Sequence, residues 1–247
     1  MQLLFICFIG IVIGSICTKV GMHFPIEESI FEKSTCSHCG YKHSYIAFFN
    51  YFINSGRCKN CGARLRFLPV LNEAFTGLFF VLSYYIFGFS YSFFIAIGII
   101  CLLMIILISD LNYMIIPDEV LVLFSAYFIL VLFFKIGLMS VLLQIGYGIF
   151  LFLVMYFIMI LGEVIFKKES LGGGDVKMMF IFGLILGPLS GVFSIFVASF
   201  IALPVSIIIM LKSDNNAIPF GPFLLISLML FFFLQIDTDF IINLLRF

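Results

Sequence analysis

Charged residues and tryptophan are what this sequence has least of. Only 11% of its 247 residues are charged, tryptophan is absent, and 64% are hydrophobic. Soluble domains are nearer half apolar and a quarter charged. A soluble fold of this size could not bury so much apolar surface, so we expect membrane lipid to cover part of it. The basic and acidic residues cancel, and this balance gives no indication of a nucleic-acid partner.

The first apolar run lacks the features of a cleaved signal peptide. Residues 1–18 contain no lysine or arginine, and no small-residue cleavage site follows a short apolar core. We therefore expect a retained membrane helix here. A membrane helix needs roughly 20 mostly apolar residues, and the whole chain offers eight such candidates. They lie near residues 2–18, 69–88, 91–109, 116–134, 138–166, 176–190, 191–211 and 219–236. The expected fold class is thus an all-α polytopic membrane protein.

The basic residues are distributed unevenly among the predicted loops. Eleven of them fall in the loops after the first, fifth and seventh spans or just beside those loops, against two, Lys135 and Arg246, on the other side. Since cytoplasmic loops carry the excess of lysine and arginine, we expect both termini outside a cytoplasmic membrane. The aspartates did not enter this choice. It nevertheless places Asp110, at the end of the third span, and Asp175, at the start of the sixth, at the cytoplasmic boundary.

The long polar segment between the first two spans contains two C-x2-C pairs separated by eighteen residues. The four residues are Cys36, Cys39, Cys58 and Cys61. Four thiolates in this pattern form a tetrahedral shell that suits Zn²⁺ and leaves no open position for catalysis. Disulfides and a redox-active C-x-x-C are the alternatives, and the reducing cytosol argues against disulfides. Gly40 and Gly62 follow the pairs, where a turn often needs positive φ.

These patterns predict three parts of the chain. Residues 1–18 form the first membrane helix, residues 19–68 a small cytoplasmic zinc domain, and residues 69–247 a seven-helix membrane domain. The zinc ion is expected to fold a segment that has too little apolar core to fold alone.

Two of the carboxylates near the predicted spans stand in distinctive surroundings. Asp110 ends an apolar run, and Asp175 follows three glycines, Gly172, Gly173 and Gly174, where another backbone can approach closely. Two carboxylates a few ångströms apart can hydrolyse an amide, because one takes a proton from water while the other donates a proton. An aspartate at a helix end is also often a cap, which is our expectation for Asp118. The glycines could equally be a flexible break.

Several short motifs, in order along the chain, resemble those of the bacterial type IV prepilin peptidases, which are G-x-G-D aspartic membrane proteases. Gly14-Ser15 is similar to the opening GS motif of that family, and the cysteine pairs follow it. The later matches are Arg64–Glu73 (RLRFLPVLNE), Asp110–Asp118 (a D-x6-P-D element), Lys168–Lys177 (KESLGGGDVK) and Ile218–Pro222 (IPFGP). Any one match is modest, whereas all of them in order are specific.

The resemblance implies a function. It implies that Asp110 and Asp175 are the catalytic pair of a peptidase whose substrates are prepilin or pseudopilin precursors. These carry a short basic leader, which is removed at the cytoplasmic face by cleavage after glycine. Many members also methylate the new N-terminus with S-adenosylmethionine. The family often has a tryptophan and a proline between its cysteine pairs, in a region associated with methylation, and the stretch His43–Phe52 here has neither.

Two other functions fit parts of the sequence. A zinc-stabilised transporter or channel would explain carboxylates near the membrane, but it should show paired inverted halves or charges in mid-span. The sequence shows neither. Another G-x-G-D protease that cuts within a membrane helix would share the aspartates, but the cysteine segment and the IPFGP segment favour the prepilin class.

Overall fold

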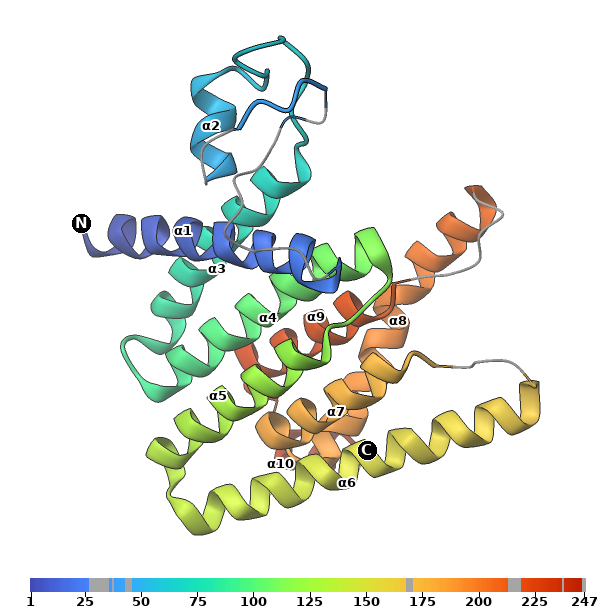
Figure 1. The fold of residues 1–247 in the computed structure, drawn as a ribbon. Helices are drawn as coiled ribbons and strands as arrows, with labels where there is room; N and C mark the ends of the chain where they lie inside the picture. The colour runs from blue at the N-terminus through green and yellow to red at the C-terminus, as the bar shows by residue number, and fades with distance from the viewer. Residues whose placement is uncertain are drawn as a thin grey trace.

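The computed structural model describes residues 1–26, 36, 38–42, 46–167, 171–212, 219–236 and 238–245. The regular elements of these residues are all helical (Figure 1). They are α1 (Gln2–His23), the 3-10 helix η1 (Phe24–Ile26), α2 (Ala47–Ile53), α3 (Leu68–Phe87), α4 (Tyr91–Tyr113), α5 (Asp118–Ile136), α6 (Leu138–Phe166), α7 (Gly173–Leu186), α8 (Pro188–Lys212), α9 (Gly221–Phe233) and α10 (Thr238–Leu245). The predicted all-α polytopic class is confirmed.

Among the described residues, six helices are long and apolar enough to cross a membrane: α1, α3, α4, α5, α6 and α8. The predicted sixth and eighth spans correspond to α7 and α9, which have only 14 and 13 residues. Eight crossings therefore stay a prediction. The predicted break between the sixth and seventh spans is present, but it lies at Gly187, which has φ +79°, and not between residues 190 and 191 as the span limits had it.

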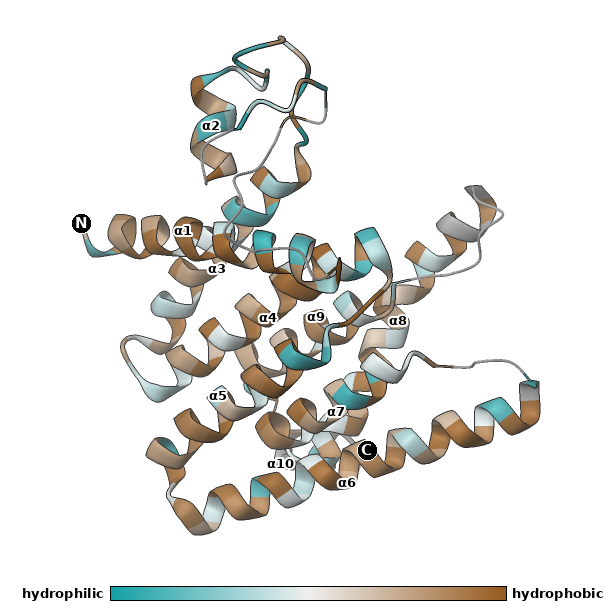
Figure 2. Cartoon of the chain, viewed as in Figure 1, coloured by the Kyte–Doolittle hydropathy of each residue, from teal (hydrophilic) through white to brown (hydrophobic). Residues whose placement is uncertain are grey.

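Helix α4 forms the centre of the bundle, and the other long helices are more exposed. In its most apolar window, 78% of α4 is buried inside the protein, against 17% for α6. Helix α6 exposes mostly apolar side chains, as Figure 2 shows by its brown colour. Apolar faces of this size are covered by lipid in a membrane protein. The chain is therefore a multi-pass membrane protein.

Small residues let α1 pack closely against α3. A Cβ atom at Gly10 would lie 2.7 Å from Cα of Gly77, and one at Gly14 would lie 2.7 Å from Oγ1 of Thr76. Such close contacts between small residues are common where membrane helices associate. Next to them the Asn72 amide donates a hydrogen bond to the Thr18 hydroxyl at 2.8 Å. These contacts hold α1 against α3, the helix that follows the cysteine segment in the chain.

Two short helices were not predicted. Helix α2 has seven residues and lies between the two cysteine pairs, and α10 follows the last predicted span. Neither is long enough to give a membrane-length apolar run. We call the described residues 36, 38–42 and 46–67 the cysteine module. It lies above α1 and α3 in the view of Figure 1, outside the bundle of long helices.

Candidate active site and metal centre

Asp110 lies in the last turn of α4, where the helix ends in a fixed turn. Met114 adopts a left-handed conformation with φ +55° at the helix end. The Ser109 hydroxyl donates a hydrogen bond to the backbone carbonyl of Ile115, which closes this turn. Asp110 is buried, and its carboxylate lies against Gly221 at the start of α9, where an added Cβ would be 3.2 Å from Oδ2. The carboxylate is thus held between two helices.

Asp175 lies in the first turn of α7 and is also buried. Gly172 is the N-cap of this helix, and Gly173 and Gly174 are its first two residues, so the glycines open a helix and do not form the flexible break that was the alternative. Gly172 and Gly173 are exposed beside the buried aspartate. Residues 168–170, which begin the predicted KESLGGGDVK motif, lie outside the described residues.

The structure brings the two aspartates into one region through Ile116 and α9. A Cβ at Gly174 would lie 2.6 Å from Cβ of Ile116, and one at Gly221 would lie 3.1 Å from its Cδ1. Helix α9 also packs against both α4 and α7. The sequence could not predict this proximity.

Each of the two carboxylates has a buried oxygen without a hydrogen-bond partner. Among the described side chains, Oδ2 of Asp110 and Oδ1 of Asp175 are two of the few such atoms. Buried polar atoms are nearly always paired with protein or water. Both oxygens can therefore accept a hydrogen bond from water or from a substrate, which a carboxylate with a purely structural role does not require.

Asp118 does not cap α5 as the sequence suggested. Pro117 is the N-cap of this helix, which has no side-chain cap. Instead the Asp118 carboxylate forms an ion pair with the ammonium of Lys177, with 2.5 Å between Oδ2 and Nζ. The capping prediction failed because the sequence does not show that α7 lies beside α5. The pair connects the start of α5 to a residue two positions after Asp175.

If this ion pair holds the first turn of α7, its two members act as a unit. We expect Lys177→Gln and Asp118→Asn each to lower kcat/KM for peptide cleavage about two- to fivefold, because exposed pairs contribute about 0.2–1 kcal/mol. The double variant should lose no more than either single variant. Steady-state cleavage rates at low and high salt test this, since salt screens the pair. Losses that multiply in the double variant would contradict the coupling.

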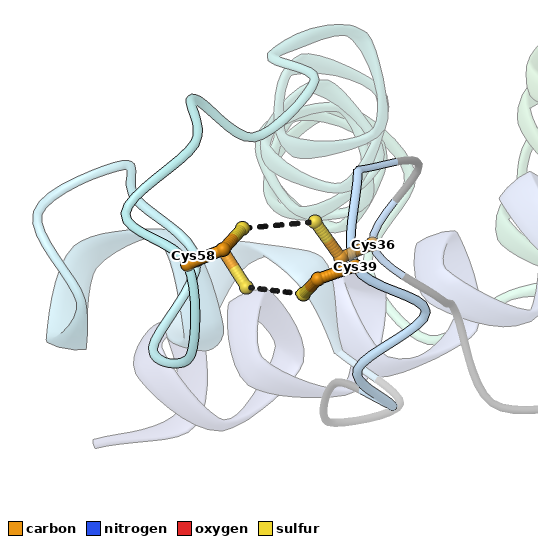
Figure 3. Close-up of side chains that lie close together, drawn as sticks. Cys36, Cys39 and Cys58 are labelled. Atoms are coloured by element: carbon orange, nitrogen blue, oxygen red, sulfur yellow. Dashed lines mark hydrogen bonds between the residues drawn. The ribbon is translucent and has the colours of Figure 1, made fainter.

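The four cysteines predicted as metal ligands lie together in the cysteine module. Their sulfur atoms are all within 4.8 Å of one another, with 3.8 Å between Cys36 and Cys61 and 3.7 Å between Cys39 and Cys58. Figure 3 shows the labelled sulfurs of Cys36, Cys39 and Cys58 directed toward a common point. A tetrahedral ion with metal–sulfur bonds of about 2.3 Å needs sulfurs about 3.8 Å apart. The cysteines therefore fit one metal ion.

The backbone prepares both cysteine pairs for metal binding in the same way. The N–H groups of Gly40 and Gly62 donate to the carbonyls of Cys36 and Cys58, each at 2.9 Å. Both glycines have positive φ, +68° and +72°, as the sequence predicted. Backbone N–H groups, first that of Cys61, lower the pKa of the Cys58 thiol to about 7. This favours the thiolate, which is the form that binds metal.

Glu73 connects the cysteine module to the membrane helices. This residue of α3 is only 1% exposed, and its carboxylate accepts the N–H groups of Ala47 at 3.0 Å and Phe48 at 2.6 Å, at the start of α2. Ser15 and Lys19 of α1 also interact with it. Buried carboxylates need such partners. In the sequence Glu73 is the last residue of the Arg64–Glu73 motif, and the capping contact depends on the folded chain.

The fold and these sites define a class: a multi-pass helical membrane protein with a four-cysteine metal module and two buried aspartates at neighbouring helix ends. Two family models match the chain. The type IV leader peptidase family matches residues 96–207, which include both aspartates, and the bacterial peptidase A24 N-terminal domain matches residues 8–87, which include the four cysteines. The chain belongs to the type IV leader peptidase family, as the motifs indicated.

Two characterised relatives agree with this assignment. The chain is 27% identical over 191 residues to the prepilin leader peptidase/N-methyltransferase of Bacillus subtilis (strain 168), covering 76% of this chain and 74% of that protein. It is 26% identical over 191 residues to the protein of the same name from Myxococcus xanthus (strain DK1622), covering 74% of this chain and 55% of that protein. No solved structure matches the chain significantly.

Proposed function

We propose that this protein is a membrane-embedded aspartic endopeptidase that removes the leader from type IV prepilin or pseudopilin precursors. Cleavage occurs after glycine at the cytoplasmic face of the cytoplasmic membrane, with both termini of the chain outside. The observation that carries the proposal is the buried pair, Asp110 and Asp175, each with an oxygen free of protein partners. Membership of the leader peptidase family supports it.

The proposed mechanism needs only the two carboxylates and water. One carboxylate, ionised, removes a proton from the attacking water, while the other, protonated, donates to the carbonyl oxygen of the scissile bond. A proton is then returned to the leaving amine, and the peptide bond breaks. Neighbouring carboxylates do not ionise together easily, so they share one proton between them.

The substrate peptide is proposed to lie extended along the start of α7. Gly172 and Gly173 are exposed there, next to the buried Asp175. Because they have no side chains, a peptide backbone can approach them closely. The precursor enters laterally from the membrane through its apolar helix, while its basic leader stays in the cytosol.

We propose that the cysteine module holds a structural zinc ion. Cys36, Cys39, Cys58 and Cys61 fit a tetrahedral four-thiolate site, for which Zn²⁺ is the usual ion. When bound, the ion cross-links the two cysteine pairs and stabilises the module. Four thiolates leave no open coordination position, so hydrolysis is assigned to the aspartates alone.

A second activity is proposed from the names of the two relatives, which both include N-methyltransferase. The reaction would transfer a methyl group from S-adenosylmethionine to the new N-terminus of the cleaved pilin. We assign no described residue to this cofactor. The mass of the cleaved product decides whether the activity is present.

The experiment that tests the proposed function is cleavage of a purified type IV prepilin by the purified protein in detergent. Mass spectrometry of the product should show loss of the leader, with one additional methyl group if S-adenosylmethionine is used. A matched precursor, in which the glycine before the cleavage site is replaced by a bulky residue, should stay intact. If the wild-type precursor also stays intact, in lipid as well as in detergent, the proposal fails.

A further inference from the structure

We propose that the start of α9 positions Asp110 for catalysis and that Gly221 is the positioning residue. This inference rests on the proposed peptidase function and concerns the Ile218–Pro222 segment, to which that function gives no role. Ile218 lies outside the described residues, so the argument uses Phe220, Gly221 and Pro222.

The backbone donors at the start of α9 identify Gly221 as the group that holds Asp110. The first N–H groups of a helix have no partners within it. Here the N–H groups of Phe223 and Leu224 both donate to the carbonyl of Phe220, at 3.1 and 3.2 Å. Pro222 has no N–H. The N–H of Gly221 is therefore the donor left in this first turn, and Gly221 lies directly beside the Asp110 carboxylate.

The atoms packed around position 221 explain why the residue there is a glycine. A Cβ atom there would lie 3.2 Å from Oδ2 of Asp110, 3.1 Å from Cδ1 of Ile116 and 3.2 Å from Cγ2 of Ile106. These distances are tighter than about nine in ten Cβ contacts in proteins. A side chain at this position would push the start of α9 away from Asp110 or turn the carboxylate. Position 221 thus needs both a free N–H and the absence of a Cβ.

The arrangement has a direct consequence for the reaction. The backbone of Gly221 lies against the Asp110 carboxylate and limits how that carboxylate can turn, while its Oδ2 has no protein partner and is available to water. The orientation of a catalytic group within a fraction of an ångström governs kcat. Substrate binding along Gly172 and Gly173 does not involve Gly221, so KM should depend little on it.

The test compares Gly221→Ala, Ile116→Val/Gly221→Ala and Gly146→Ala with wild type in prepilin cleavage. Gly146 on α6 is the matched control, because a Cβ there has open space. The double variant removes Cδ1 of Ile116 and so relieves that contact, but it keeps the contact with Asp110. Rates are measured on the monodisperse fraction of each variant, which separates turnover from folding.

We expect kcat to fall about 10- to 100-fold in both Gly221 variants, with KM within about twofold of wild type, because small displacements of reacting groups have effects of this size. Gly146→Ala should match wild type. The positioning role would be overturned by a wild-type kcat in Gly221→Ala, or by recovery of kcat when Ile116→Val is added. In that case an inactive Asp110→Asn variant in the same assay would leave the peptidase proposal standing. Wild-type cleavage by Asp110→Asn would overturn both.

Discussion

Asp110→Asn and Asp175→Asn are each expected to lower kcat for prepilin cleavage by between about 10²- and 10⁴-fold, the usual contribution of a general acid or base. Asparagine has nearly the shape of aspartate, but it can neither accept the proton of the attacking water nor donate a carboxyl proton. The loss should therefore appear in catalysis, with little change in packing. The measurement is the steady-state rate of leader removal by each purified variant.

Two controls separate a catalytic loss from a folding defect. Each asparagine variant should elute from size exclusion like wild type and keep its metal content, because the cysteine module lies away from both substitutions. Asp118→Asn provides a third acidic substitution at the same end of the bundle, and its loss should not exceed about fivefold for an exposed ion pair. Equal losses in all three variants would contradict a specific role for the aspartate pair.

Removing one metal ligand is expected to unfold the cysteine module. Cys58→Ser should lower the zinc content from about one equivalent per chain to a small fraction of it, because structural zinc sites need all four ligands. Zinc binding contributes on the order of 10 kcal/mol or more to folding in small zinc modules. The module should then become sensitive to limited proteolysis. Metal analysis of the purified protein and the fragment pattern measure these effects.

Cys7→Ala is the matched control for the metal site, because Cys7 is a free cysteine of α1 outside the four-cysteine cluster. This variant should keep its zinc and its resistance to protease. A chelator that removes zinc from wild type should reproduce the proteolysis pattern of Cys58→Ser. Full zinc occupancy in Cys58→Ser, or an intact module after complete chelation, would contradict a structural role for the ion.

The helices of this protein could be predicted because their determinants are local. Long apolar runs define α3 to α6, and glycine or proline separates neighbouring helices. Gly187 and Pro188 form the junction between α7 and α8, a few residues before the predicted boundary at 190 and 191. The spacing of the four cysteines is also local, and it predicted both the cluster and the positive φ of Gly40 and Gly62. The seven-residue helix α2 gave no comparable signal.

The features that could not be predicted depend on contacts between distant parts of the chain. Asp110 and Gly221 are more than a hundred residues apart in the sequence, and they are in contact only because α9 packs on α4. The ion pair between Asp118 and Lys177 likewise requires α5 and α7 to be neighbours. Asp118 was therefore interpreted as a local cap, the role that sequence spacing alone favours.

The same limit applies to the link between the cysteine module and the membrane helices. Glu73 ends the Arg64–Glu73 motif at the start of a predicted span, where a carboxylate is costly without a partner, but the sequence does not identify that partner. Its bonds to the N–H groups of Ala47 and Phe48 join segments 25 and 26 residues apart. A carboxylate in an apolar run thus indicates that a partner exists, and only the structure identifies it.

The central claim is that Asp110 and Asp175 form one catalytic unit. The most direct test measures kcat for prepilin cleavage in wild type, Asp110→Asn, Asp175→Asn and the double variant. Residues that act as a unit have non-additive effects, so the double variant should be no slower than the slower single variant. Losses that multiply in the double variant, or a wild-type rate in either single variant, would contradict the shared site.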